Sequence, residues 1–344
     1  MKPPALQNIR DFLNGKTPRL LSVPHEPRYR QCADRREMLA AACEVIAKDM
    51  ALPASENVLP SFLPDYGTVS MPAVYGGRVV PARDGGGIHI LPVARTVGDV
   101  LALAPKLFEE TDFQRALDDH REICGRLGTR DIYLRTPDLQ GPMNTLALLF
   151  EDQAELIAAL YEQPDVAHEA LRRVTDMTIE LVSRFRAEAG PEKVIGNIWP
   201  FTALPDGRGV CVTQDYMPLL GPDLYAEFEL PCLRRIADTF GGVYIHCCGR
   251  FAWHLPALAT SGANIIGIEC SNDHTPMEDV FAAFGTRIAI TSFGNNGHAS
   301  LADYVRSFKG TPMARARLWL TPTQGSEGLD DLRRAMEELD EKPA

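Results

Sequence analysis

Residues 243 to 254, "VYIHCCGRFAWH", place a histidine and two adjacent cysteines directly after a β-branched and aromatic run. Such a run is typical of a buried strand. Alternate side chains of a strand point to the same side, so we expect His246 and Cys248 to share one side and Cys247 to face the other as a packing residue. An imidazole nitrogen and a thiolate at this spacing can chelate one zinc ion.

A catalytic zinc site needs a third protein ligand. Cys270 is the first choice, because it ends the next apolar stretch and neighbouring parallel strands lie about 4.8 Å apart. His274, four residues further on, is a lesser candidate. The alternative is that the cysteines are small buried hydrophobic residues and that His246 is a hydrogen-bonded residue at a strand end. Both interpretations stay open at this point.

Polar side chains follow several other apolar stretches, and each of them alone could be a helix cap or a loop hydrogen-bonding residue. Taken together they indicate a site. We predict catalytic roles for Asp215 and Glu269. The residues predicted to bind substrate are Asp138, Gln140, Asn144, Gln214, Arg250 and Asn295. Thr323 and Gln324 complete the expected rim.

The elements that must position these residues alternate between strand and helix from residue 96 to residue 344. Such alternation predicts a parallel sheet covered by helices, and strands this apolar are buried on both faces. A doubly wound open sheet is an alternative, but no glycine-rich phosphate-binding fingerprint follows the first strand. Because the polar residues gather at the carboxyl ends of the strands, we predict a (β/α)₈ TIM barrel. Residues 1–95, rich in Pro and Gly, are expected to form an irregular N-terminal part of the same single domain.

Composition narrows the class of protein. The chain has 344 residues, of which 45% are hydrophobic and 24% charged, and this predicts an ordinary folded core. Lys and Arg number 35 against 46 Asp and Glu, a net charge of −11, which argues against a nucleic-acid-binding surface. The start "MKPPALQNIRDFLNGK" lacks the apolar segment of a signal peptide, and the apolar runs are too short to span a membrane. We therefore expect a cytoplasmic protein whose eight cysteines are reduced thiols.

From Asp138 to the C-terminus the sequence resembles the uroporphyrinogen decarboxylase superfamily. The stretches that carry the resemblance are "PDLQGPMNTLALLF", "QDYMPLLGPDLYAEFELPCLRRIADTF", "YIHCCGRFAWHLPALATSGANIIGIEC" and "RIAITSFGN". The order of a QGP turn, an acidic strand end, an HxCG strand end and an "SGAN" strand is similar to the corrinoid-dependent methyltransferase branch. The resemblance implies a (β/α)₈ barrel.

Two departures from the superfamily pattern restrict what the resemblance implies. Porphyrinogen decarboxylases carry an "RQAGRY"-like substrate loop and a later strand-end Asp, whereas this chain reads "VPHEPRYRQCADRRE" and has no comparable Asp. Zinc-dependent methyltransferases of the superfamily add a cysteine after the last strand, and "LTPTQGSEG" contains none. His246 and Cys248 match the zinc motif, so either Cys270 replaces the missing ligand or the metal is absent.

The resemblance implies transfer of a methyl group between a corrinoid such as methylcobalamin, carried by a partner protein, and a small acceptor. A thiol acceptor would explain zinc, because an open metal site binds the sulfur as thiolate. With tetrahydrofolate as acceptor no zinc is required, and Asp138, Asp215 and Asn295 would orient the pterin. Residues 55 to 95 could form one wall of the approach for the corrinoid.

Two other functions stay open. A decarboxylase of a polycarboxylate or tetrapyrrole-like substrate would need a cluster of cations, for which Arg28, Arg30, Arg135 and Arg250 are candidates. A non-catalytic protein could use the barrel mouth to hold a corrinoid or tetrapyrrole. Release of carbon dioxide would identify the first, and tight binding without turnover the second.

Overall fold

The computed structural model of the protein describes residues 4–22, 34–64, 66–81, 88–198, 202–205, 207–322 and 328–340. Its helices are α1 (Pro4–Leu13), α2 (Arg35–Ala51), α3 (Ser70–Val74), α4 (Val97–Ala102), α5 (Asp112–Leu127), α6 (Pro142–Leu149), α7 (Gln153–Glu162), α8 (Pro164–Ala189), α9 (Pro222–Leu224), α10 (Leu230–Phe240), α11 (Leu255–Thr260), α12 (Met277–Phe284), α13 (Leu301–Arg306) and α14 (Leu329–Asp340). Its strands are β1 (Arg19–Leu21), β2 (Ser61–Phe62), β3 (Arg78–Pro81), β4 (Ile88–Leu91), β5 (Tyr133–Arg135), β6 (Val194–Ile198), β7 (Thr202–Leu204), β8 (Val210–Thr213), β9 (Val243–Cys247), β10 (Ile265–Ser271), β11 (Ala289–Phe293) and β12 (Arg317–Leu320).

The strands form a barrel wall from two sheets. One sheet has the order β1-β12-β11-β10-β9-β8, and all its pairs are parallel. The second has the order β2-β5-β6-β7, in which only β7 runs antiparallel. A parallel bridge between Gln140 and Thr213 joins the segment after β5 to the end of β8. The strands thus form a TIM-barrel-like fold, which confirms the prediction made from the alternation of strands and helices and from the polar residues at the strand ends.

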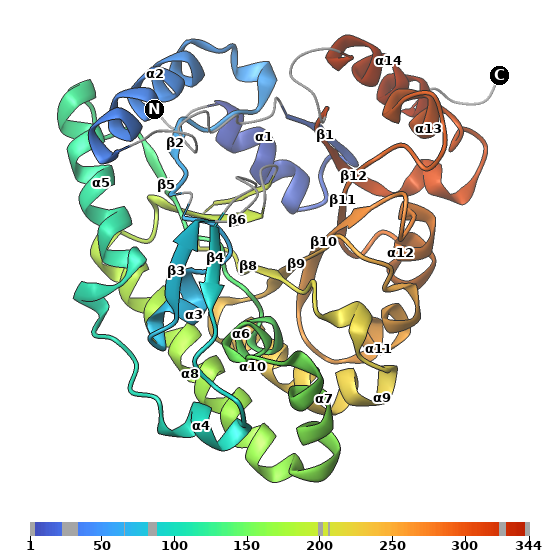
Figure 1. Ribbon diagram of the computed structural model, residues 1–344. Coiled ribbons are helices and arrows are strands. Elements are labelled where there is room, and N and C mark those ends of the chain that lie inside the picture. Colours follow the sequence, from blue (N-terminus) through green and yellow to red (C-terminus); the bar gives the residue numbers. More distant parts are fainter. Residues whose placement is uncertain are drawn as a thin grey trace.

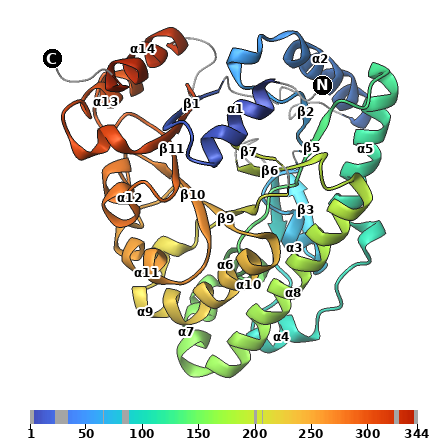
Figure 2. The same cartoon turned by 180° about the vertical axis from the view of Figure 1, so that it is seen from behind.

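Helices surround this wall, as Figures 1 and 2 show from opposite sides. Parallel neighbours in a sheet need a crossover connection, which is usually a helix. Helix α10 connects β8 to β9, α11 connects β9 to β10, α12 connects β10 to β11, and α13 connects β11 to β12. In the described part of the chain, no helix is both long and apolar enough to cross a membrane.

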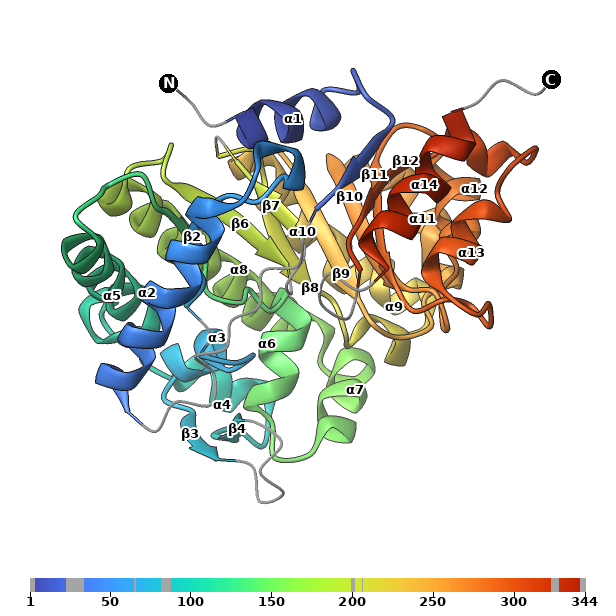
Figure 3. The same cartoon turned by 90° about the horizontal axis from the view of Figure 1, so that it is seen from above.

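Helix α1 closes the end of the barrel at which the strands begin. Figure 3 shows α1 across one end of the strands and α6 at the other. The ring of Phe12 meets that of Trp319 edge to face at 5.8 Å, and Arg317, the first residue of β12, donates a hydrogen bond to the Phe12 carbonyl. Apolar side chains of α1 and of the inner faces of the strands form one buried cluster here. The opposite end of the barrel is therefore left for a site.

The inward-facing residues change from apolar to polar along the strands. On β9, Tyr244 belongs to the inner apolar cluster, and His246 follows two residues later on the same face. On β8, Cys211 lies in that cluster and Thr213 comes after it. Because alternate residues share a face, the polar set lies above the apolar one, toward the carboxyl ends of the strands.

The expectation that residues 1–95 are irregular is wrong for the first half of that segment. Residues 4–51 contain helices α1 and α2, and β1 and β2 pair in parallel with barrel strands. Hydrophobic periodicity does not predict helix α2, because only Leu39, Ala42 and Ile46 on it are buried. Beyond β2, the short helix α3 and the β3–β4 hairpin do match the expectation of loops with short strands.

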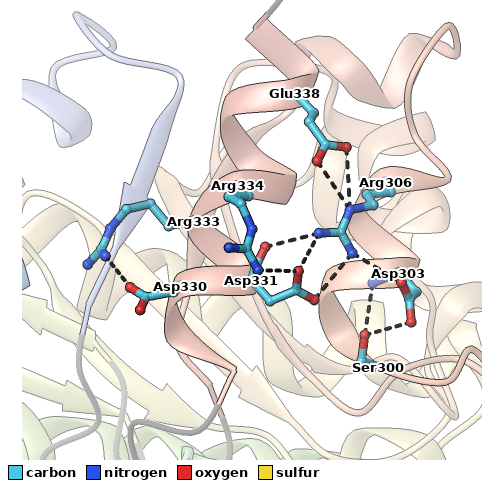
Figure 4. A network of polar contacts seen from close by, with 8 residues as sticks. All are labelled: Ser300, Asp303, Arg306, Asp330, Asp331, Arg333, Arg334 and Glu338. Atoms are coloured by element: carbon cyan, nitrogen blue, oxygen red, sulfur yellow. Dashed lines mark hydrogen bonds and ion pairs between the residues drawn. The ribbon is translucent and has the colours of Figure 1, made fainter.

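The last two helices are tied together by charge. Arg306 at the end of α13 contacts Asp331 and Glu338 of α14, and also Asp303 of its own helix (Figure 4). The Ser300 side chain caps α13 by accepting a hydrogen bond from the backbone N–H of Asp303. These contacts fix α14 on α13 beside the carboxyl ends of β11 and β12.

Candidate active site at the carboxyl ends of the strands

His246, Cys248 and Asp215 meet at the mouth of the barrel. Their ligand atoms all lie within 4.8 Å of one another. The distance from Asp215 Oδ1 to His246 Nε2 is 3.7 Å, and the backbone N–H of Cys248 donates to Asp215 Oδ1 at 2.9 Å. The prediction that His246 and Cys248 share a side is confirmed. Asp215 joins them because β8 ends beside β9, where Thr213 pairs with His246.

The two cysteines separate as strand alternation predicts. Cys247 is fully buried and packs into the outer hydrophobic core between the strands and the helices, whereas Cys248 is exposed. The loop that carries Cys248 is fixed by the buried Thr275, whose hydroxyl accepts from the N–H of Phe251 and donates to the carbonyl of Gly249.

Glu269 lies behind His246, on the side away from the mouth. The two residues are direct register partners on β10 and β9, and Glu269 Oε2 is 3.5 Å from His246 Nδ1. Glu269 is fully buried, and neither carboxylate oxygen has a hydrogen-bond partner, nor does His246 Nδ1. A buried carboxylate is tolerated when it is paired, so the imidazole is its natural partner. His246 is thus held between Glu269 below and Asp215 at the mouth.

These carboxylates set the protonation of the site. Burial lowers the pKa of His246, but its contacts with Cys248 and Glu269 outweigh burial, so the imidazole pKa is raised well above its ordinary value. Burial raises the pKa of Glu269, although His246 opposes this. Burial also raises the pKa of Asp138, against a hydrogen bond from Gln140 and the charge of the nearby His246. A carboxyl group with a raised pKa beside a polar mouth is a typical proton acceptor or donor.

Asp138, Gln140 and Asn144 form one chain of hydrogen bonds. The Gln140 amide donates to Asp138 Oδ1 at 2.9 Å, and Asn144 donates to Gln140 Oε1 at 3.0 Å. The Asn144 oxygen accepts from the backbone N–H of Tyr216, the residue after Asp215. The structure therefore brings the three predicted residues together and connects them to Asp215. Gln140 and Asn144 are buried and use their side chains within the protein, whereas Asp138 is partly exposed.

Gln214 binds the buried carboxylate of Glu229, a residue that was not among those predicted from the sequence. Its amide donates to Glu229 Oε1 at 2.6 Å, and Glu229 Oε2 accepts from the N–H of Met143 at 2.9 Å. Glu229 is fully buried at the end of the π-helical turn Tyr225–Glu229, and burial raises its pKa to about 7. The sequence feature that could have identified Glu229 is its position on the apolar face of its helix, four residues after Tyr225.

Cys270 is not part of the group at the mouth. It is fully buried in the outer core, opposite Cys247 in the strand register, and its thiol donates to the Thr291 carbonyl. The prediction of Cys270 as third ligand is wrong because it overlooked alternation: His246 and Glu269 are register partners that face inward, so the next residue on each strand faces outward. His274 is exposed after β10 and is outside the three-residue group.

The remaining predicted residues that the structure describes are in the segments after β9 and β11. Arg250 is exposed in the loop after β9. Asn295, after β11, is partly buried and lines a cavity of about 420 Å³. Other residues on that cavity's wall are Gly294, Ser300, Leu301, Pro322 and Leu332. Arg28, Arg30, Thr323 and Gln324 lie outside the described residues.

The donor set at the mouth fits a divalent metal ion. An imidazole, a thiolate and a carboxylate are all zinc ligands, and three protein ligands leave one position open for a substrate. Thiolate and carboxylate together carry two negative charges, which balance those of the ion. The buried Glu269 beside Nδ1 is the outer-shell partner that a metal-binding histidine usually has.

Comparison with known proteins supports the superfamily resemblance. Residues 205–295 match the family model of uroporphyrinogen decarboxylase (URO-D), which confirms the resemblance that the strand-end motifs indicate. A methyltransferase from Methanosarcina mazei has a similar structure, with a TM-score of 0.67, 13% sequence identity and coverage of 98% of each chain. At this identity the likeness shows a shared fold. No curated protein matches the chain significantly.

Proposed function

We propose that the protein is a methyltransferase that moves a methyl group from a corrinoid, carried by a partner protein, to a thiol bound at the mouth of the barrel. The URO-D family match and the fold shared with a methyltransferase support a methyltransferase-like function. The choice of a thiol as methyl acceptor is supported by one observation: His246 and Cys248 lie close together beside carboxylates at the carboxyl ends of the strands. That end is where TIM barrels place their chemistry.

The residues of the chain have distinct tasks in this proposal. His246 and Cys248 would hold zinc, which when bound would take the substrate sulfur as a ligand and favour its thiolate form at neutral pH. Glu269, 3.5 Å from His246 Nδ1, would orient the imidazole from below. Asp138, whose pKa is raised by burial, would accept the thiol proton. Gln140 keeps Asp138 in position through its hydrogen bond.

The transfer is a nucleophilic displacement at the methyl carbon. The sulfur of the thiolate forms a bond to the methyl carbon while the carbon–cobalt bond breaks, and both electrons of that bond stay on the cobalt. The products are a thioether and a corrinoid reduced by two electrons at the metal. The thiol proton goes to a carboxylate and then to solvent, so no other oxidant or reductant is needed.

The rim has features suited to a docked partner. Leu219, after β8, is 60% exposed and Trp253, after β9, is 44% exposed. Trp253 donates a hydrogen bond to the buried His254, which holds its ring in place at the surface. Both residues lie in the segments that follow the strands leading to Asp215 and Cys248. This is consistent with a corrinoid delivered on a protein.

A polycarboxylate decarboxylase is less well supported by the described residues. Of the arginines proposed for it, Arg135 is buried inside the barrel and donates to Ser61, and Arg250 is exposed on the rim. The described residues therefore supply these two cations in different surroundings rather than as one cluster.

Free methylcobalamin tests the proposal. Wild-type protein, methylcobalamin and a small thiol should give demethylation, followed through the visible spectrum of the corrinoid, and Cys248→Ala should lose this activity while remaining folded. If demethylation occurs with tetrahydrofolate and does not occur with any thiol, the methyl acceptor is a pterin. Carbon dioxide release from a porphyrinogen, or binding of the corrinoid without turnover, would overturn methyl transfer.

A further inference from the structure

Asp215 brings a third possible ligand atom to within 4.8 Å of those of His246 and Cys248. It follows β8, and its carboxylate lies 3.7 Å from His246 Nε2 and within 4.8 Å of Cys248 Sγ. Its side chain is 38% exposed, so an ion held there would stay open to the mouth of the barrel. Asp215 Oδ1 is already fixed by the N–H of Cys248 at 2.9 Å, which leaves the second carboxylate oxygen free of that restraint.

Other sulfur ligands are excluded within the described residues. Cys247 and Cys270 are buried in the outer core. Cys211 faces the barrel interior, but it lies two residues below Thr213 in the apolar layer. After β12 the sequence reads "TPTQG" and contains no sulfur at all. Among the described cysteines, Cys248 is the one that reaches the group at the mouth.

We propose that Asp215 is the third protein ligand of a divalent metal ion held with His246 and Cys248. The proposal rests on the proposed function for the identity of the site, and it replaces a two-thiolate ligand set by one nitrogen, one sulfur and one oxygen. The net charge of the ligands is unchanged, because a carboxylate stands where a thiolate would. Oxygen is a harder donor than sulfur and gives less electron density to the ion. The bound acceptor sulfur would therefore be polarised more strongly than in a two-thiolate site.

Metal affinity without substrate tests this assignment. The zinc dissociation constant is measured by competition with a chromogenic chelator for wild-type protein, Asp215→Asn, Asp215→Ala and Asp215→Cys. Loss of an outer-shell partner costs about 10–100-fold in affinity, so loss of a direct ligand in Asp215→Ala should cost more than about 100-fold. Asp215→Asn keeps the shape and can still accept from the Cys248 N–H, and it should also weaken binding strongly. Asp215→Cys should restore tight binding.

Cobalt(II) gives a second readout that a merely structural role would not change. The intensity of the thiolate-to-cobalt charge-transfer band should correspond to one sulfur in wild-type protein and should rise in Asp215→Cys. Cys270→Ser is the matched control: its sulfur lies on the outer face at the same level of the sheet, and this variant should bind zinc like wild type. Circular dichroism establishes that each variant is folded.

The outcomes separate this assignment from the proposed function. If Asp215→Asn binds zinc as tightly as wild type, or if Cys270→Ser loses the metal, Asp215 is not the ligand, while thiol methylation by the wild type would still stand. If the Asp215 variants lose zinc but the wild type never demethylates methylcobalamin, the ligand assignment holds and the methyltransferase proposal fails. A wild-type protein that binds no zinc would overturn the ligand assignment.

Discussion

At the scale of single residues, the site depends on how one imidazole is held. His246 has a buried carboxylate on one side, 3.5 Å from Nδ1, and a partly exposed one on the other, 3.7 Å from Nε2. Its ring also stacks near Phe293, with centroids 6.2 Å apart. An N–H on Nδ1 would point to Glu269 and leave Nε2 as the ligand atom, which is the arrangement that a buried carboxylate favours.

Glu269 should therefore control metal affinity from outside the ligand set. Glu269→Ala leaves Nδ1 without a partner and should weaken zinc binding by about 10–100-fold, whereas Glu269→Gln keeps an acceptor for Nδ1–H and should lose less. Chelator competition measures both variants, and nitrogen-15 NMR of labelled histidine reports the His246 tautomer. Equal affinity in all three proteins, with an unchanged tautomer, would show that Glu269 does not position the imidazole.

Adjacent cysteines should behave oppositely. Cys247→Ala removes a buried sulfur from the outer core and should lower the free energy of unfolding by roughly 1–2 kcal/mol, with methyl transfer nearly unchanged. Cys248→Ala removes an exposed side chain and should abolish transfer at little cost in stability. Urea unfolding and the methylcobalamin assay on the same samples check both statements. A loss of transfer in folded Cys247→Ala as large as that in Cys248→Ala would contradict the assignment.

Residue types and alternation predicted much of this site, and register explains the error. The placement of His246, Cys247 and Cys248 followed from a period of two along one strand. Cys270 was misplaced because proximity of strand ends was used without asking which residue on β10 pairs with His246. That partner is Glu269, and a sequence alone does not give the register between neighbouring strands.

At the scale of elements, one glycine sets the spacing of the inner layer. A Cβ on Gly267 of β10 would lie 2.1 Å from the ring of Tyr244 on β9, and that ring is fully buried. Gly267→Ala should therefore destabilise the protein by about 1–3 kcal/mol through overpacking and displace Glu269, two residues along the strand. Thermal unfolding and zinc affinity both measure the effect. Gly125→Ala in α5, where nothing lies within 4 Å, is the control and should be neutral or slightly stabilising.

The buried carboxyl group of Glu229, which accepts hydrogen bonds from Gln214 and Met143, should make the free energy of unfolding depend on pH. Its pKa is raised by burial from 4.5 to about 7, so the folded state favours the protonated acid. The resulting stabilisation is complete below the unfolded-state pKa and is lost as the pH rises from about 4.5 to 7. Between pH 5 and pH 8 the free energy of unfolding should fall by roughly 2–3 kcal/mol from this group. Glu229→Gln, which cannot ionise, should lack this part of the decline in urea unfolding, and an identical decline in both proteins would refute it.

At the scale of the whole molecule, the two ends of the barrel are specialised. Helix α1 and an apolar inner layer fill the end at which the strands begin, while polar side chains gather at the other end. Strand–helix alternation predicted the parallel sheet covered by helices, and the polar residues at the strand ends favoured a barrel over an open sheet. The role of α1 could not be predicted, since its contact with β12 joins residues about 300 positions apart, and no local pattern in the sequence records such a contact.

The proposed methylation of a thiol requires a metal ion at the mouth of this barrel. Elemental analysis of protein purified without chelators tests it most directly. We expect about one zinc per chain in the wild type and its loss in Cys248→Ser, whereas Cys270→Ser should still contain zinc. A wild type that contains no zinc, and takes up none when zinc is added, would contradict this requirement. A pterin rather than a thiol would then be the favoured methyl acceptor.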